Sequence, residues 1–337
     1  HIIGPQTAHK YHPEAREEIN RRIDRIAAAG RDPVPKRVRF TTWTLRYSQM
    51  LWVRVDGLEE HWERARVDAE IVDDHTVRVT TENVSALTLS MPAGLCPLDN
   101  TRPPVVILNK RNLTAPAVES DRSWTAHFQK EGARWAVADA SARASETEIL
   151  RKRPGLQGPI DDAFLDSFLM VAPSKSPFHD ATARWVNAEL AHATNHWRRQ
   201  FRGLARVKAD HAVTEADIQN HHLILWGDPS SNELIARIQD QLPLQWNDRR
   251  IDLGAQSFSS RQHMPVLIYP NPLNPKRYVV LNSGFTFREY DYLNNARQVP
   301  KLPDFAVIDI AQPVTSRSPG GIAAAGFFDE SWRVPAK

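Results

Sequence analysis

Hydrophobic positions near the start of the chain recur with the period of an α-helix. Between residues 14 and 29 they fall on one face, and Gly30 followed by two prolines gives a helix stop signal. The sequence HIIGP before this helix is typical of a buried strand that runs into a loop. We therefore predict that residues 1–33 form the end of a domain. The apolar positions of the helix are Ala15, Ile19, Ile23, Ile26 and Ala27.

From residue 36 to residue 140 the hydrophobic period changes to two, which is typical of half-buried β-strands. Short apolar runs alternate with turn sequences such as Asp56-Gly57. Many short strands with regular turns predict a small antiparallel β-sandwich. Trp43, Trp52 and Trp62 fall in this part and are candidates for a sugar-stacking platform, although tryptophan in a small β domain more often packs in the core or at an edge.

Between residues 155 and 337 apolar strands alternate with helical patterns. Residues 168–171 and 223–226 are continuous apolar runs, and residues 180–201 show a strong amphipathic helical pattern. Continuous apolar strands separated by helices predict an α/β domain with a mostly parallel sheet covered on both faces. The whole chain is therefore predicted to be of mixed class.

Composition excludes several classes of protein. The chain has 337 residues, of which 41% are hydrophobic and 25% are charged, so it is not disordered. No run of about 18 apolar residues occurs, and we expect no membrane span. The single cysteine, Cys96, excludes an internal disulfide framework and a multi-cysteine zinc site. The net charge is +3 with both signs interspersed, and we expect no nucleic-acid partner.

Histidines in the N-terminal loop are the first candidates for chemistry. His9 and His12 lie in the sequence HIIGPQTAHKYHPE, between the predicted strand and helix. A loop that leaves a strand and enters a helix is where α/β-hydrolases carry the triad histidine, last in chain order after serine and aspartate. Spacing alone leaves open, and favours, the alternative that they are ordinary solvated loop histidines.

A second candidate is the loop between an apolar strand and a helix at residues 227–232. Loops at the carboxyl end of parallel strands bind ligands, and helix N-termini favour anions. The alternative is a helix N-cap built from a serine or asparagine of this loop. Asn271 and Ser283 also follow strands, and we expect all these side chains to share one edge and form a crevice. The candidate ligand-binding residues are Asp228, Ser230, Asn232, Asn271 and Ser283.

His192 and His196 have the i, i+4 spacing that places two imidazoles on one face of a helix. Ala193 stands where the H-E-x-x-H motif has glutamate, and no third ligand is apparent. We therefore predict no metal site and no cofactor.

Four segments of the chain resemble a known family. They are GPQTAHKYHPEA, TTWTLRYSQMLWVRVDGLEEHWERARVDAEI, LILWGDPSSNELIARI and VLIYPNPLNPKRYVVLNSGFTFREY. Together they resemble the C-terminal half of large bacterial hydrolases of the prolyl oligopeptidase-like family, within the α/β-hydrolase superfamily. The resemblance implies that residues 1–33 are the last loop and helix of the hydrolase domain. It implies His9 as the triad histidine of a serine esterase or peptidase, with His12 as runner-up.

The chain departs from this family in one respect that matters for chemistry. It contains no G-x-S-x-G, and Asn282-Ser283-Gly284 lacks the pattern of a nucleophile elbow. We therefore predict that the chain alone is inactive. Its expected partners are an ester or peptide substrate and a missing N-terminal hydrolase region, in the same polypeptide or in a separate chain. A secretion signal would lie in that region, so secreted or periplasmic localisation stays open. The alternative function is a non-catalytic binding module, for example for carbohydrate.

Overall fold

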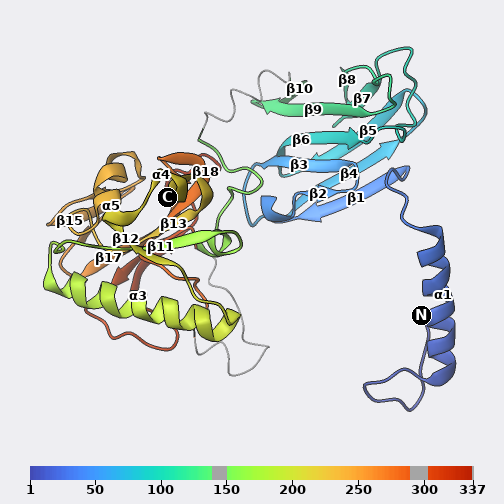
Figure 1. Cartoon of the computed structure of the whole chain (residues 1–337). Helices are drawn as coiled ribbons and strands as arrows, with labels where there is room; N and C mark the ends of the chain where they lie inside the picture. Colours follow the sequence, from blue (N-terminus) through green and yellow to red (C-terminus); the bar gives the residue numbers. More distant parts are fainter. Residues whose placement is uncertain (139–149, 289–302, 336–337) are drawn as a thin grey trace.

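The computed structural model of the chain describes residues 1–138, 150–288 and 303–335. Figure 1 shows a separate N-terminal helix, a part made of two β-sheets, and a part in which helices lie beside a larger sheet. The fold is thus mixed, with several sheets and few helices. None of the described helices is both long enough and apolar enough to cross a membrane.

Helix α1 (Pro13–Ala29) confirms the predicted N-terminal helix. Pro13 occupies its first turn, where a missing N–H costs nothing, and Gly30 ends it at φ 69° with its N–H directed at the carbonyls of Ile26 and Ala27. Only Ala15 of this helix is buried. Ile23 and Ile26 are 56% and 70% exposed, so the described residues leave the apolar face of α1 uncovered.

Residues 37–137 form two five-stranded sheets that enclose one hydrophobic core. Their neighbouring strands are antiparallel except for β5 and β7, which are parallel. One sheet has the order β1 (Arg37–Thr42), β4 (Ala65–Ile71), β5 (Thr76–Glu82), β7 (Val105–Leu108) and β8 (Arg111–Thr114). The other has the order β10 (Arg134–Val137), β9 (Trp124–Glu131), β6 (Val84–Met91), β3 (Val53–Leu58) and β2 (Gln49–Met50).

The three tryptophans considered as a sugar platform have different surroundings. Trp52 is buried in the core, and its indole N–H donates to the carbonyl of Pro35 at 2.9 Å. Trp62 packs against Phe327 with ring centroids 5.7 Å apart, and Trp43 is exposed. The three side chains therefore do not form one exposed platform.

The C-terminal part is built on a seven-stranded mixed sheet. Its first four strands run parallel to one another, whereas the steps from β18 onward are antiparallel. The prediction of a mostly parallel sheet is therefore wrong. The order is β12 (Val207–Ala209), β11 (Phe168–Ala172), β13 (His222–Leu225), β18 (Asn274–Leu281), β17 (His263–Asn271), β19 (Phe305–Asp309) and β20 (Gly321–Gly326).

A short connection explains the change of strand direction. Only Pro272 and Leu273 separate β17 from β18, and a two-residue connection can join only antiparallel strands. Helix α3 (Asp180–Phe201) confirms the predicted long helix and runs along one side of the sheet. Helices α4 (Glu215–Asn220) and α5 (Glu233–Ile238) lie on the other side (Figure 1). A small sheet of β14 (Gln245–Trp246), β15 (Arg250–Leu253) and β16 (Gln256–Ser259) follows α5.

A buried ion pair joins three distant segments of this part. Lys152 Nζ lies 2.7 Å from Asp304 Oδ2, with the two side chains 0% and 1% exposed. The same carboxylate oxygen accepts the N–H of Phe328 at 3.0 Å, and the ammonium lies 5.4 Å from the centre of the Trp332 ring. Burial raises the pKa of the Asp304 carboxyl, and Lys152 opposes that rise. The pair fastens the start of β19 to residues 152 and 328–332.

The same C-terminal tail also contacts the two-sheet part. Glu330 Oε1 accepts the backbone N–H of His61 at 2.9 Å and lies 2.6 Å from its Nδ1. The carbonyl of Glu330 accepts the N–H of Lys152. A second link is formed by Arg46 and Asp162, whose charged atoms are 3.3 Å apart. We name residues 328–332 the C-terminal clasp, since they contact both parts of the chain.

The Asp304→Asn variant tests the buried pair. It keeps an acceptor for the Phe328 N–H but leaves the Lys152 charge without its counter-ion, so we expect the free energy of unfolding to fall by about 3–5 kcal/mol. Glu82→Gln breaks the exposed pair with Arg64 and should cost at most about 1 kcal/mol. Urea unfolding measures both, and losses of equal size would contradict a special role for the buried pair.

His222, the first residue of β13, is a buried histidine that stays neutral. Its Nδ1 accepts the backbone N–H of Tyr278 at 2.8 Å, and the side chain is 6% exposed. Burial lowers the pKa of the imidazole from 6.5 to about 4, and the Arg277 guanidinium acts in the same direction. The folded chain therefore resists protonation at a pH where the unfolded chain accepts a proton.

This difference predicts a pH dependence of stability. The contribution of His222 is complete above pH 6.5 and is lost as the pH falls toward about 4, with a total of about 3 kcal/mol. His222→Asn keeps an acceptor for the Tyr278 N–H but does not titrate, so its free energy of unfolding should fall less over this range. Urea unfolding between pH 7 and pH 4 measures the difference, with the exposed His9→Asn as control. Parallel profiles for His222→Asn and wild type would contradict the assignment.

Candidate functional site

The N-terminal histidines lie in a surface loop directly before α1. His9 is exposed, and His12 is the N-cap residue of α1 without a capping bond from its side chain. The loop is held by the Thr7 hydroxyl, which donates to the carbonyl of Gly4 at 2.9 Å. Among the described residues, neither imidazole has a serine or a carboxylate as partner. A triad around His9 would therefore need groups from outside the described residues.

Asp228 is buried, and its carboxylate accepts hydrogen bonds from backbone groups of its own loop and of the segment before α3. Its Oδ1 accepts the N–H groups of Ser230 and Ser231 at 3.1 and 2.9 Å, and its Oδ2 accepts that of Phe178 at 2.8 Å. The side chain is 1% exposed. These bonds hold the loop after β13 against the segment before α3, and they occupy the carboxylate that we predicted to face a ligand.

Asn232 confirms the alternative interpretation of this loop as a helix N-cap. Its Oδ1 accepts the N–H groups of Leu234 and Ile235, and its Nδ2 donates to the carbonyl of Trp226 at 2.9 Å. The side chain is fully buried. Ser230 donates its hydroxyl to the carbonyl of Ser176 at 2.6 Å. Asn232 and Ser230 thus bond to the protein's own backbone.

The loops after β13 and β18 do meet at one edge of the sheet, because these neighbouring strands are parallel. Asn282 joins them: its Oδ1 accepts the N–H of Gly227 at 2.8 Å, and its Nδ2 donates to the carbonyls of Gly227 and Pro265. Ser283 follows, and its hydroxyl donates to the carbonyl of Gly284 at 2.6 Å. Asn282 therefore joins the loop that carries Asp228 to the loop that carries Ser283.

Asn271 does not belong to this edge. It ends β17, pairs with Asn274 at the start of β18, and lies at the opposite end of the sheet from Asn282. Its Oδ1 accepts the N–H of Leu273 in the hairpin connection. The expectation that Asn271 would share a crevice with Asp228 and Ser283 is wrong, because β17 and β18 are antiparallel.

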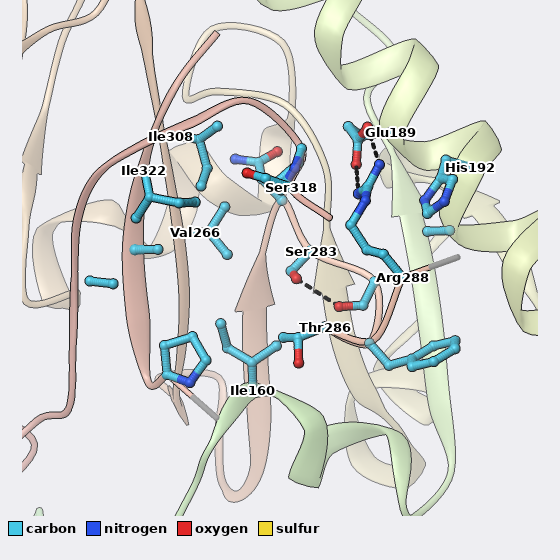
Figure 2. Close-up of a pocket in the computed structure, with 18 of the residues that line it drawn as sticks. Ile160, Glu189, His192, Val266, Ser283, Thr286, Arg288, Ile308, Ser318 and Ile322 are labelled. Atoms are coloured by element: carbon cyan, nitrogen blue, oxygen red, sulfur yellow. Dashed lines mark hydrogen bonds and ion pairs between the residues drawn. The ribbon is translucent and has the colours of Figure 1, made fainter. Parts of the chain in front are cut away.

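A cavity of about 230 Å³ lies beside Ser283, between α3 and the antiparallel half of the sheet. Its floor consists of strand residues from β17, β19 and β20 that lie side by side in the ladder, since Val266 pairs with Ala306, Ala306 with Ala325, and Ile308 with Ile322. Figure 2 shows Val266, Ile308 and Ile322 on one side of the cavity and Ser283, Thr286 and Arg288 on the other. The cavity thus has an apolar side and a polar side.

The polar side includes a buried ion pair between Glu189 of α3 and Arg288 of the loop after β18. Arg288 Nη1 lies 2.8 Å from Glu189 Oε2, both side chains are 8% exposed, and Arg288 Nε donates to the carbonyl of Thr315. Near it Thr286 donates its N–H and its hydroxyl to the Asp161 carboxylate. Burial raises the pKa of Asp161, and the Thr286 bonds oppose that rise. These contacts hold the loop after β18 against α3 and η2 (Ile160–Phe164).

The two histidines of α3, His192 and His196, line the same cavity and stack on each other. Their rings stack with centroids 5.1 Å apart, and His196 Nε2 bonds to the carbonyl of Phe287 at 2.6 Å. In the described part of the chain, no group of three or more His, Cys, Asp or Glu side chains is placed to hold a metal ion.

Comparisons with known proteins give no family for the chain. No protein-family model, no curated protein and no solved structure matches it.

Sequence reasoning missed Glu189 and Arg288. Glu189 carried a usable signal, because it interrupts the apolar face of α3 between Val186 and Ala193, where a buried carboxylate requires a partner. Arg288 gave no such signal, since it lies in a loop far along the chain and meets Glu189 only in the folded protein.

Substitutions of the adjacent residues Asn282 and Ser283 test which of the two side chains stabilises the sheet edge. Asn282→Ala removes three buried hydrogen bonds that join the loops after β13 and β18, and we expect the free energy of unfolding to fall by about 3 kcal/mol. Ser283→Ala removes only a bond to the next residue's carbonyl and should cost less than about 1 kcal/mol. Urea unfolding measures both, and the reverse order would contradict this assignment.

Proposed function

We propose that residues 1–33 complete the catalytic domain of a serine hydrolase, with the rest of that domain supplied by sequence outside this chain. The observation that carries the proposal is the uncovered apolar face of α1, where Ile23 and Ile26 are mostly exposed. An amphipathic helix is stable in a folded protein when its apolar stripe packs against another element. The resemblance of the chain to prolyl oligopeptidase-like hydrolases suggests that the element packed against α1 belongs to a serine hydrolase domain.

The position of His9 fits the role of general base in such a domain. It lies exposed in the loop that leads into α1, so its imidazole is accessible to groups packed against that helix. In the proposed reaction it accepts the proton of a serine hydroxyl as the serine oxygen attacks an ester or peptide carbonyl. It then gives the proton to the leaving alcohol or amine, and water releases the acyl group from serine by the same route.

The alternative of a carbohydrate-binding module has less support. Its discriminating feature was a surface lined with tryptophan, and Trp52 is buried in the core while Trp62 packs against Phe327. In the hydrolase proposal, the sandwich and the mixed sheet are accessory parts of the enzyme, and the C-terminal clasp joins them to each other.

The proposal is tested with the protein isolated from its native source. We expect its intact mass to exceed 38.3 kDa, or a co-purifying subunit to carry G-x-S-x-G, and the nucleophilic serine to react with a fluorophosphonate probe. In that complete protein His9→Ala should lower kcat for ester hydrolysis by at least about 10³-fold with little change in substrate binding. The chain of residues 1–337 alone should be inactive.

His12→Ala is the matched control, since His12 stands three residues away in the same loop. It should retain most of the activity. Near-normal turnover of His9→Ala would exclude His9 as the base, and loss of activity only in His12→Ala would move the role to His12. A native protein of 38.3 kDa without a serine nucleophile would exclude the hydrolase function.

A further inference from the structure

One surface of the C-terminal part lies where α3 ends and two strands of the large sheet begin. β11 and β12 are parallel neighbours, so the loops that enter them lie at the same edge of the sheet, and α3, which connects the two strands, ends at that edge. Arg206 joins the two loops, since its Nη2 donates to the hydroxyl oxygen of Ser167 at 2.7 Å. We name Leu165 together with residues 198–207 the α3-end surface.

Large apolar side chains project from the α3-end surface. Leu204, in the loop between α3 and β12, is 80% exposed, and Leu165, in the loop before β11, is 62% exposed. Phe201 and Val207 are exposed as well. Trp197 supports Phe201, because the two rings pack with their centroids 4.3 Å apart. Single exposed apolar residues are common, but four that gather at one edge of a sheet indicate an interaction site.

Positive charge surrounds these apolar side chains. Residues 190–209 include four arginines and one lysine but no aspartate or glutamate. Lys208 is paired with Asp217, whereas in the described part of the chain no carboxylate lies within ion-pair distance of the four arginines. Asp166, which follows Leu165, is paired with Arg277 at 2.7 Å. The four arginines are all exposed: Arg198, Arg199, Arg202 and Arg206.

The stability of α3 explains only part of this charge. Cations in the last turn of a helix interact favourably with the helix dipole, which accounts for Arg198 and Arg199. Arg202 instead occupies the C-cap at φ 60°, a left-handed conformation that favours glycine, and Arg206 lies beyond the helix. Cations so close together repel one another, and a negatively charged partner removes that repulsion.

The exposed leucines select between the classes of anionic partner. A guanidinium group binds phosphate oxygens through two parallel hydrogen bonds, so nucleic acids and phospholipids both match the arginines. The phosphate backbone of a nucleic acid gives Leu165 and Leu204 no apolar contact. A bilayer matches both features, because apolar side chains enter the boundary between headgroups and acyl chains while basic side chains contact anionic headgroups.

We propose that the α3-end surface docks on a membrane that contains anionic phospholipids. Leu165, Phe201 and Leu204 enter the headgroup region, and the four arginines contact the charged groups of the lipids. Every residue of this surface is a described residue of the chain, so the proposal does not rest on the hydrolase function.

Co-sedimentation of the whole 337-residue chain with vesicles tests the docking. The vesicles consist of phosphatidylcholine alone or of phosphatidylcholine with an equal amount of phosphatidylserine. We expect at least about tenfold tighter binding to the vesicles with phosphatidylserine, and weaker binding as the salt concentration rises. Equal binding to both vesicles, or no binding to either, would overturn the proposal. Binding to duplex DNA as tight as to the anionic vesicles would assign the surface to nucleic acid instead.

Two double variants with the same loss of charge locate the electrostatic contact. Arg199→Gln/Arg202→Gln should weaken binding to the anionic vesicles about 30-fold, since each basic residue near an anionic membrane contributes about 1 kcal/mol. Arg249→Gln/Arg261→Gln is the matched control, because Asp248 contacts His179 at the other end of α3, about 33 Å away along a helix of 22 residues. Equal effects of the two double variants would show that net charge alone drives binding and would overturn the site.

A pair of leucine variants tests the apolar contact. Leu204→Ser should weaken binding to the anionic vesicles at least about fivefold, because the side chain loses its burial in the bilayer. Leu95→Ser replaces an exposed leucine of the two-sheet part and should leave binding unchanged. Wild-type affinity of Leu204→Ser would contradict insertion and overturn the docking mode. Far-UV circular dichroism and urea unfolding verify the fold of each variant.

Discussion

The buried contact between Lys152 and Asp304 is the interaction on which the arrangement of the C-terminal part depends. It brings the segment that leaves the two-sheet part, the first residue before β19 and the C-terminal clasp to one point that excludes water. An ammonium and a carboxylate removed from water tolerate little displacement, because loss of either partner leaves a charge in an apolar surrounding. Glu330, two residues beyond Phe328, then ties the same clasp to His61.

Contacts elsewhere in the C-terminal part determine which side chains are available to a ligand. The side chains of Asp228, Asn232 and Asn282 hold the loops after β13 and β18, because each forms hydrogen bonds with backbone groups. The cavity lies next to these loops, between α3 and the antiparallel strands β17, β19 and β20. Among the described residues no such contact holds the N-terminal helix, and its exposed isoleucines are the reason to look for a partner domain.

The two proposals concern separate chemistry and can fail separately. The hydrolase proposal depends on His9 and on groups outside the chain, so it is decided on the complete native protein. The docking proposal depends on the α3-end surface, all of which belongs to this chain.

Local patterns in the sequence were enough to predict α1, α3 and the short strands before residue 138, because each depends on neighbours within a few turns of chain. For the helix N-cap after β13 they gave three candidates, Ser230, Ser231 and Asn232, and the structure selects Asn232. The hairpin at Pro272 and Leu273 was also present as a local signal, and its two-residue length dictates the antiparallel half of the sheet. The pairs Glu189–Arg288 and Lys152–Asp304 were not predictable, since their partners are separated by 99 and 152 residues. Only tertiary packing brings them together, and burial makes those contacts strong enough to shape the cavity and the clasp.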